Sequence, residues 1–180
     1  IFTIKGNNEG KRTPDNLFVV TGITQVLDQY GEACERLEGC GNGYKDISFL
    51  TSGTGVLSGI RKGDVINFML DKSGRVNTVS RPIVRLQDPF TKHIDAGTDF
   101  YPLRNIRATI AEVDFENGRI ILNYGTEEVT FPFTSSINCM EYNKTSQECD
   151  LINYDSFVKE DTVLVVTKHY GIRDMIRICD

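Results

Sequence analysis

The chain has 180 residues, of which 39% are hydrophobic and 25% charged, a composition typical of a globular protein and not of a disordered or collagen-like one. Its net charge of -5 lacks the basic excess with which proteins bind phosphate backbones. No apolar run approaches the roughly 20 residues of a membrane-spanning helix, and no segment resembles a signal peptide. Because the chain begins with Ile1, we expect a processed product or a piece of a longer protein.

Apolar residues recur with a period of two along most of the chain, and β-branched and aromatic types dominate these segments, which predicts an all-β fold. In chain order, strands are expected at residues 17–27, 44–50, 65–70, 75–84, 107–114, 119–124, 128–133, 162–168 and 172–178. Within residues 128–133, Pro132 cannot donate a hydrogen bond to a neighbouring strand, so we expect this strand at a sheet edge.

Residues 25–38 are ambiguous, because their apolar positions also fall at helical spacing, as in Val26, Tyr30, Cys34 and Leu37. Gly31 lies in the middle of this segment and argues against a helix. The internal repeat described below aligns the segment with a strand and turn, so we predict a hairpin.

Three short connections contain glycines in positions that favour turns. Residues 71–74 and 114–118 each place an Asp ahead of a Gly that can accept a positive φ, which is typical of hairpins. The glycines of residues 39–43 superficially resemble a phosphate-binding loop, but an expected strand follows them where such a loop needs a helix. We therefore predict a hairpin or bulge there and no phosphate site.

The two halves of the chain resemble each other. Residues 23–26 align with residues 110–113, and the same offset brings Gly31 onto Gly118. Two further segments align at other offsets, namely 43–49 with 125–131 and 62–66 with 159–163. The differing offsets indicate insertions in loops, the largest near residues 135–154.

This repeat predicts two tandem small β-barrel modules, OB-like or SH3-like, because five short strands suffice for a barrel that removes most exposed edges. We expect the first module at residues 1–86 and the second at residues 104–180. Residues 87–103 contain two prolines and several acidic residues, and we interpret them as a linker.

The five cysteines are Cys34, Cys40, Cys139, Cys149 and Cys179. An odd number means that at least one of them has no partner within the chain. Cys34 with Cys40, and Cys139 with Cys149, are two candidate disulfides, and free buried thiols in a reducing compartment are an equal alternative.

No recognisable catalytic motif is present. The two histidines, His93 and His169, have no partner motif for nucleophilic catalysis, and the cysteine spacing matches no zinc site. The Lys-x-Asp sequence that occurs twice, at Lys62–Asp64 and Lys159–Asp161, is interpreted as a turn leading into a strand. We predict no catalytic, cofactor or metal site, and a protein that is not an enzyme.

Residues 57–76 and 163–176 resemble repeated β-modules found downstream of S-layer homology domains in Firmicute surface proteins. In those modules a Lys-Gly-Asp turn leads into an apolar strand, an Asp-x-x-Gly turn and a closing strand, and a Tyr-Gly hairpin often ends the last module. The resemblance implies an exported, non-catalytic structural or spacer segment at a bacterial cell surface. It carries over no active-site residue, and the anchoring homology domain itself is not in this chain.

The leading hypothesis is therefore a structural or interaction segment of a surface protein that assembles with protein partners or with itself. The strand at 128–133, or a starting strand at residues 1–5, would pair with a neighbouring subunit by strand addition. A phage or virion structural component is a close variant. The alternative is an oligonucleotide- or ligand-binding barrel in which Phe18, Tyr44 and Phe68 form a stacking face.

Overall fold

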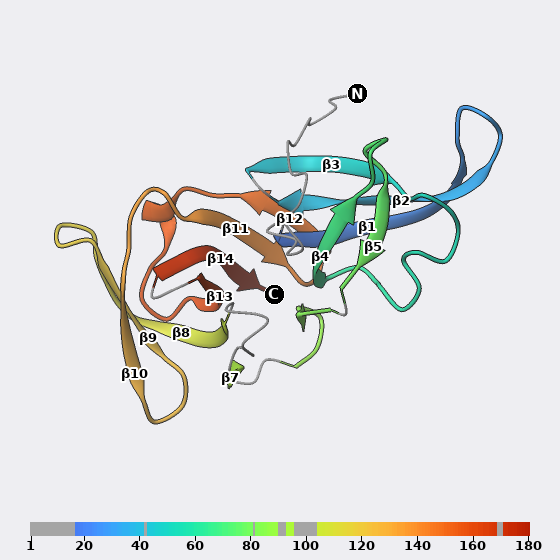
Figure 1. Ribbon diagram of the computed structural model, residues 1–180. Helices are drawn as coiled ribbons and strands as arrows, with labels where there is room; N and C mark the ends of the chain where they lie inside the picture. The colour runs from blue at the N-terminus through green and yellow to red at the C-terminus, as the bar shows by residue number, and fades with distance from the viewer. Residues whose placement is uncertain (1–16, 42, 81, 90–92, 96–103, 169–170) are drawn as a thin grey trace. The chain divides into compact units, whose positions relative to one another are not determined.

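The computed structural model describes residues 17–180 except 42, 81, 90–92, 96–103 and 169–170. The chain is all-β and forms two sheets, one of which curves into a half-barrel (Figure 1). It divides into two compact units at the boundary between Arg85 and Leu86. Over the described ranges, no helix has the length and apolar character needed to cross a membrane.

The first unit contains a six-stranded sheet. Its strands are β1 (Leu17–Leu27), β2 (Ala33–Gly41), β3 (Tyr44–Leu50), β4 (Asp64–Leu70), β5 (Val76–Val79) and β6 (Val84–Arg85). The order is β3-β2-β1-β4-β5, with β6 paired to β4, and every pairing is antiparallel. Just after β3, Thr51 makes a single parallel bridge to Val76 in β5.

The second unit contains an eight-stranded sheet. Its elements are β7 (His93–Asp95), β8 (Arg104–Asp114), β9 (Arg119–Asn123), β10 (Glu128–Pro132), β11 (Asn138–Asn143), β12 (Glu148–Leu151), the 3-10 helix η1 (Tyr154–Ser156), β13 (Thr162–Lys168) and β14 (Gly171–Cys179). The order is β10-β9-β8-β13-β14-β11-β12, with β7 paired to β8. All neighbours are antiparallel except β11 and β14, which run parallel.

Each unit has an apolar core that its alternating strands supply. In the first unit, Phe18 meets Phe49 and Phe68 at ring-centroid distances of 6.1 and 5.3 Å, and Leu37 packs in the same cluster. In the second unit, strands β8, β9, β13 and β14 contribute buried aliphatic side chains: Ile106, Ala108, Ile110, Ile120, Leu122, Val163, Val165 and Met175. Strands β4 and β13 are buried on both faces, because five consecutive residues of each, 64–68 and 163–167, are buried.

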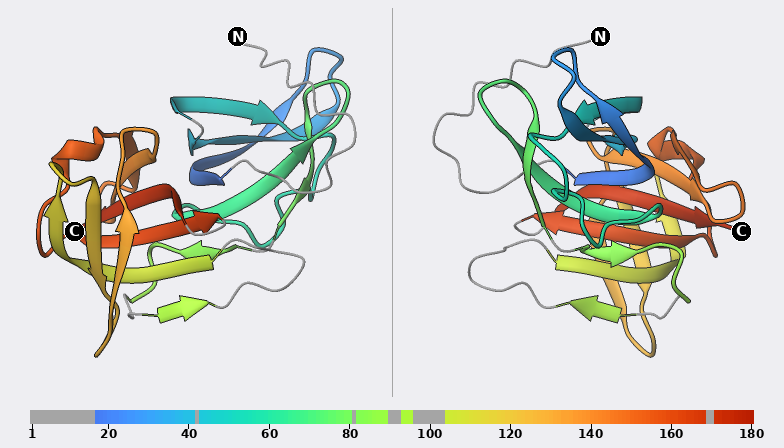
Figure 2. Two further views of the ribbon diagram at one scale, coloured as in Figure 1. Left: turned by 60° about the vertical axis from the view of Figure 1, so that its left-hand side comes forward. Right: turned by 90° about the vertical axis from the view of Figure 1, so that its right-hand side faces the viewer.

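Strands β1, β3 and β13 have the predicted bounds, and the other expected segments also contain strands. The single strand expected at residues 75–84 is instead two short strands, β5 and β6, which both pair with β4. Residues 25–38 form a hairpin, with Gln25 opposite Glu35 and Leu27 opposite Ala33, so the prediction against a helix is confirmed (Figure 2). The edge position predicted from Pro132 is also confirmed, because β10 pairs only with β9 among the described strands.

Two expectations need correction. The region 135–154, expected as a loop insertion, contains β11 and β12, because β11 gains a full parallel ladder with β14 from Asn138 to Asn143. The sheets also do not close into barrels. In the part of the chain that the structure describes, the bridge from Thr51 to Val76 is all that joins the two ends of the first sheet, and no pairing joins β10 to β12.

The segment expected as a linker contributes to the second unit in its described part. Strand β7 pairs with β8 over three residues. The side-chain amide of Gln87 donates hydrogen bonds to the Tyr142 hydroxyl at 2.8 Å and to the Lys144 carbonyl at 3.0 Å. The expected starting strand at residues 1–5 lies outside the described residues.

Candidate functional site

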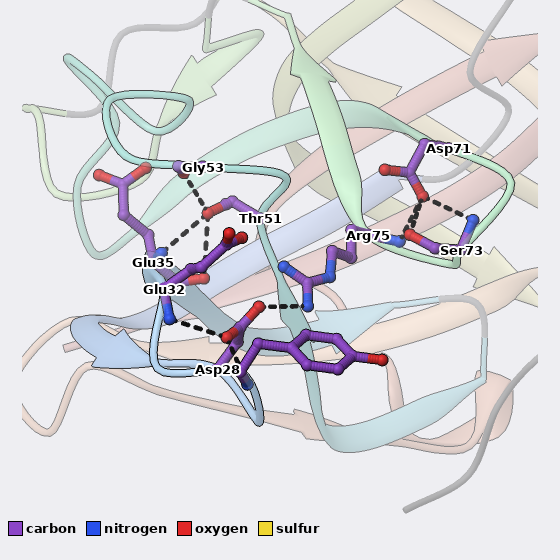
Figure 3. Close-up of polar contacts among 9 residues, drawn as sticks. Asp28, Glu32, Glu35, Thr51, Gly53, Asp71, Ser73 and Arg75 are labelled. Atoms are coloured by element: carbon purple, nitrogen blue, oxygen red, sulfur yellow. Dashed lines mark hydrogen bonds and ion pairs between the residues drawn. The ribbon is translucent and has the colours of Figure 1, made fainter.

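Polar side chains of the first unit gather where three connections meet: the β1–β2 turn, the segment after β3 and the β4–β5 turn. Figure 3 shows Asp28, Glu35, Thr51, Asp71 and Arg75 at this place. We call this set the loop cluster. Its members come from distant parts of the chain, so the fold and not the local sequence brings them together.

Asp28 holds the β1–β2 turn in one conformation. Its Oδ1 accepts hydrogen bonds from the backbone N–H groups of Tyr30 at 2.8 Å and Glu32 at 3.0 Å. Its Oδ2 lies 2.7 Å from Arg75 Nη2, and the Asp28 side chain is only 1% exposed. The Arg75 hydrogen bond, assisted by the two backbone donors, lowers the pKa of Asp28.

Arg75 is itself fixed by the β4–β5 turn. Asp71 Oδ1 accepts hydrogen bonds from the Arg75 backbone N–H at 3.1 Å, the Ser73 N–H at 2.8 Å and the Ser73 hydroxyl at 2.6 Å. The Ser73 hydroxyl is the main cause of a lowered pKa of Asp71. The hairpin predicted at residues 71–74 is therefore confirmed, with Gly74 at φ +80°.

Glu35 and Thr51 join the start of β2 to the chain after β3. Thr51 Oγ1 accepts the Glu35 N–H at 2.8 Å and donates to the Gly53 carbonyl at 2.6 Å. The buried Glu35 carboxylate accepts the Leu57 N–H at 3.0 Å and the Gln25 amide at 3.3 Å. Both side chains satisfy backbone groups that would otherwise be buried without a partner.

The hydrogen bonds of the loop cluster therefore hold three connections of the first unit in fixed conformations. Each carboxylate of Asp28, Glu35 and Asp71 accepts two or more hydrogen bonds from backbone and side-chain groups of the chain itself. Over the described ranges, no group of three or more His, Cys, Asp or Glu residues is placed to hold a metal ion. The arrangement fixes loop conformation.

The Lys-x-Asp sequences form the same turn in both units, as the sequence predicts. Asp64 Oδ2 accepts the Arg61 N–H at 3.0 Å, and Asp161 Oδ2 accepts the Val158 N–H at 2.9 Å. In each turn the residue before the Asp has a positive φ, which is +81° at Gly63 and +73° at Glu160. These carboxylates cap backbone N–H groups of the turns, and β4 begins at Asp64 while β13 begins directly after Asp161.

The structure describes all five cysteines but neither histidine side chain. None of the five cysteines is in a disulfide; Cys34, Cys40, Cys139 and Cys149 are buried, and Cys179 is partly exposed. Burial, together with the Asp174 carboxylate, raises the pKa of the Cys139 thiol to about 12. His93 lies in β7, with its side chain outside the described part, and His169 is outside the described residues.

The stacking face considered in the alternative hypothesis is not available for a nucleobase. Phe18 and Phe68 are each 3% exposed and pack against each other in the core, whereas Tyr44 is 50% exposed on β3. Both phenylalanines belong to the apolar core cluster of the first unit, so that part of the interpretation was wrong.

The sequence did not reveal the loop cluster. The local signals are the Asp71–Gly74 turn, which the sequence predicts, and Asp28, three residues before the turn glycine Gly31, which is typical of an Asx turn. Nothing in the sequence joins Asp28 to Arg75, which lies 47 positions away.

Replacing Asp28 by Asn is expected to lower the melting temperature at pH 7 by a few degrees, because the ion pair with Arg75 is lost. The folded-state pKa of Asp28 is lowered, so its contribution is present above the unfolded value of about 3.9 and is lost as the pH falls through the folded value. The difference between the two proteins should therefore shrink from pH 7 to pH 2.5 in circular-dichroism melts. Glu116→Gln, at an exposed turn, is the control, and a difference that is independent of pH would contradict the assignment.

Comparisons of the chain with protein-family models, with curated proteins and with solved structures found no match.

Proposed function

We propose that the chain is a non-catalytic structural or interaction segment of a bacterial surface protein, built from two copies of one small β-module and joined to its neighbours through sheet edges. The resemblance of residues 57–76 and 163–176 to modules downstream of S-layer homology domains supports this assignment, and it implies an extracellular or cell-surface location. The observation that carries the proposal is the order of strands shared by the two units.

In each unit a three-stranded meander is followed by a hairpin whose first strand pairs with the first strand of the meander. The order β3-β2-β1-β4-β5 in the first unit corresponds to β10-β9-β8-β13-β14 in the second. In both, the chain that follows the meander runs parallel to the last strand, as a bridge from Thr51 to Val76 in one and as β11 beside β14 in the other. This order supports an OB-like, partly open barrel for each module.

The irregularities of the two sheets also correspond. The first strand of each meander has a bulge, at Thr21 in β1 and at Ala111 in β8. The closing hairpin of each unit has another register shift, between Met69 and Leu70 and between Val166 and Thr167. Bulges are specific features that families retain, so two matching positions support descent from one module.

Open edges are the feature through which such a segment would assemble. Among the described strands, β3 pairs only with β2, β10 only with β9 and β12 only with β11. An unpaired edge presents backbone donors and acceptors that a neighbouring strand can use. Pro132 of β10 has no backbone N–H to offer a neighbouring strand, whereas β3 contains no proline, so β3 is the better candidate for pairing.

Hydrogen exchange at two protein concentrations tests the proposal. We expect amides of β3 to gain protection at high concentration, and Ser48→Lys, at an exposed edge position, to remove that gain and weaken self-association about tenfold. Ser135→Lys makes the same change in an exposed loop and should have no effect. Equal exchange of β3 at all concentrations and with added partner protein would contradict assembly through this edge.

A further inference from the structure

The tip of the β1–β2 hairpin exposes two large side chains. Leu27 is 70% exposed and Tyr30 is 76% exposed. The turn between them is ordered by the Asp28 carboxylate and by a hydrogen bond from the Gly31 N–H to the Asp28 carbonyl at 3.0 Å. The tip is therefore a preorganised projection, and exposed aromatic and aliphatic groups on such a surface are typical anchors of protein contacts.

The second unit has an open pocket of about 390 Å³ beside the bulge of β8. Its lining residues are Ala111, Glu112, Val113, Phe115, Phe157, Val158 and Lys159. Phe115 and Val158 are themselves 41% and 57% exposed, so the pocket continues into an apolar rim. A volume at the low end of the roughly 300–1,000 Å³ of ligand sites suits one or two side chains.

The charges of the tip and the pocket are complementary. At the tip, Asp28 is paired with Arg75, whereas Glu32 has no ion pair among the described residues. In the pocket, Glu112 is paired with Arg119 at 3.2 Å, whereas Lys159 has no ion pair in the described ranges. Within the described chain, an unpaired carboxylate, that of Glu32, thus lies two positions from Tyr30 at the tip, and Lys159, a pocket-lining residue, offers an unpaired ammonium group.

We propose that Leu27 and Tyr30 of one molecule insert into this pocket of a second copy, with Glu32 beside Lys159. The contact joins different surfaces of the two molecules, so it is head-to-tail, and such contacts continue into open chains unless they close into a ring. It uses no sheet edge, and it therefore goes beyond the assembly proposed above. Because the contact is small, we expect a dissociation constant on the order of 0.1–1 mM.

Sedimentation velocity of mixed variants tests the contact. The wild-type chain should gain mass continuously between about 10 µM and 1 mM, on the dissociation constant expected above. The tip variant Leu27→Ser/Tyr30→Ser and the pocket variant Val158→Glu/Lys159→Glu should each lose this gain, because each lacks one side of the contact. An equimolar mixture should form a one-to-one dimer through the remaining intact tip and pocket, and nothing larger.

Charge reversal separates this contact from a loss of folding. Glu32→Lys alone and Lys159→Glu alone should each weaken association about tenfold, and the molecule with both changes should regain it, while all variants keep their melting temperatures. A wild-type chain that stays monomeric at 1 mM, or a mixture that forms no dimer, overturns the inference. If the tip variant and the pocket variant each still self-associate, and the β3 amides gain protection, the contact between tip and pocket is wrong. Assembly through the β3 edge would then remain the explanation of the association.

Discussion

Replacement of Phe133 by alanine is expected to lower the free energy of unfolding by about 3–5 kcal/mol, the largest effect of any single change considered for this chain. Phe133 is 1% exposed, and its ring meets those of Phe115, Tyr154 and Phe157 at centroid distances of 6.0, 5.8 and 6.1 Å. Truncation removes the ring and leaves a cavity that its rigid aromatic neighbours cannot fill.

The chain has no Trp, so urea unfolding followed by far-UV circular dichroism is the suitable measurement. Phe115→Ala is the matched control, because Phe115 belongs to the same aromatic group but is 41% exposed. We expect its cost to stay below about 1.5 kcal/mol, since less apolar area is buried. Equal costs for the two variants would mean that the aromatic group does not form the core of the second unit.

The strands that could be predicted from the sequence are those whose own residue types favour a strand, whatever the rest of the chain does. In β13, Thr162–Lys168, a run of β-branched and aliphatic residues gives the strand and its bounds without reference to the rest of the fold. The hairpin turns at Asp71 and Asp114 are equally local, because the Asp side chain and the following glycine determine the turn together.

Strands β11 and β12 could not be predicted in this way. The sequence Asn138–Asn143 has no β-branched residue, and its strand conformation follows from parallel pairing with β14, whose closest residue in this ladder is more than 30 positions away. The polar Asn143 at its end accepts hydrogen bonds from the N–H groups of Thr145 and Ser146, which turns the chain into β12. Tertiary context here outweighs intrinsic propensity.

The alignment of the two halves shows a second limit. Apolar alternation aligned Ile23 with Ile110, but in the sheets Ile23 and Val113 hold corresponding positions. Each is the first of three residues that lie opposite one another on adjacent strands of the meander. These are Ile23, Leu37 and Phe49 in the first unit, and Val113, Ile120 and Phe131 in the second. The alignment of Ile23 with Ile110 is three positions away from the equivalence that the strand pairings give. Because both strands carry a bulge, apolar residues do not keep a strict period of two across it, so alternation alone cannot locate equivalent positions.

The loop cluster could not be predicted from the sequence for a different reason, which is the burial of its polar residues. Glu35 and Thr51 are both buried, at 6% and 0% exposure, although each belongs to a residue type that is mostly exposed. Their side chains form hydrogen bonds between the start of β2 and the connection after β3, and these bonds exist only once the meander has folded. A buried polar cluster of this kind follows from the topology, and local patterns do not indicate it.

Replacement of Gly39 by alanine is expected to destabilise the first unit by about 1–3 kcal/mol, because the added methyl group has no room. A Cβ at this position would overlap the Val19 carbonyl oxygen and lie 2.5 Å from the Phe18 ring. The glycine lies at the bulge between β2 and β3, which confirms the structural role predicted for residues 39–43. Its backbone is not left-handed, so the cost is one of packing.

The matched control is Gly53→Ala, made 14 positions further along the same unit. A Cβ at Gly53 would meet nothing within 4 Å, and this glycine does not have a positive φ. We therefore expect no loss there and a gain of up to about 1 kcal/mol from reduced freedom of the unfolded chain. Urea unfolding of both variants decides between the two effects. If Gly39→Ala were tolerated as well as Gly53→Ala, the close approach of β2 to β1 at Val19 would be wrong, and with it the register on which the correspondence of the two units depends.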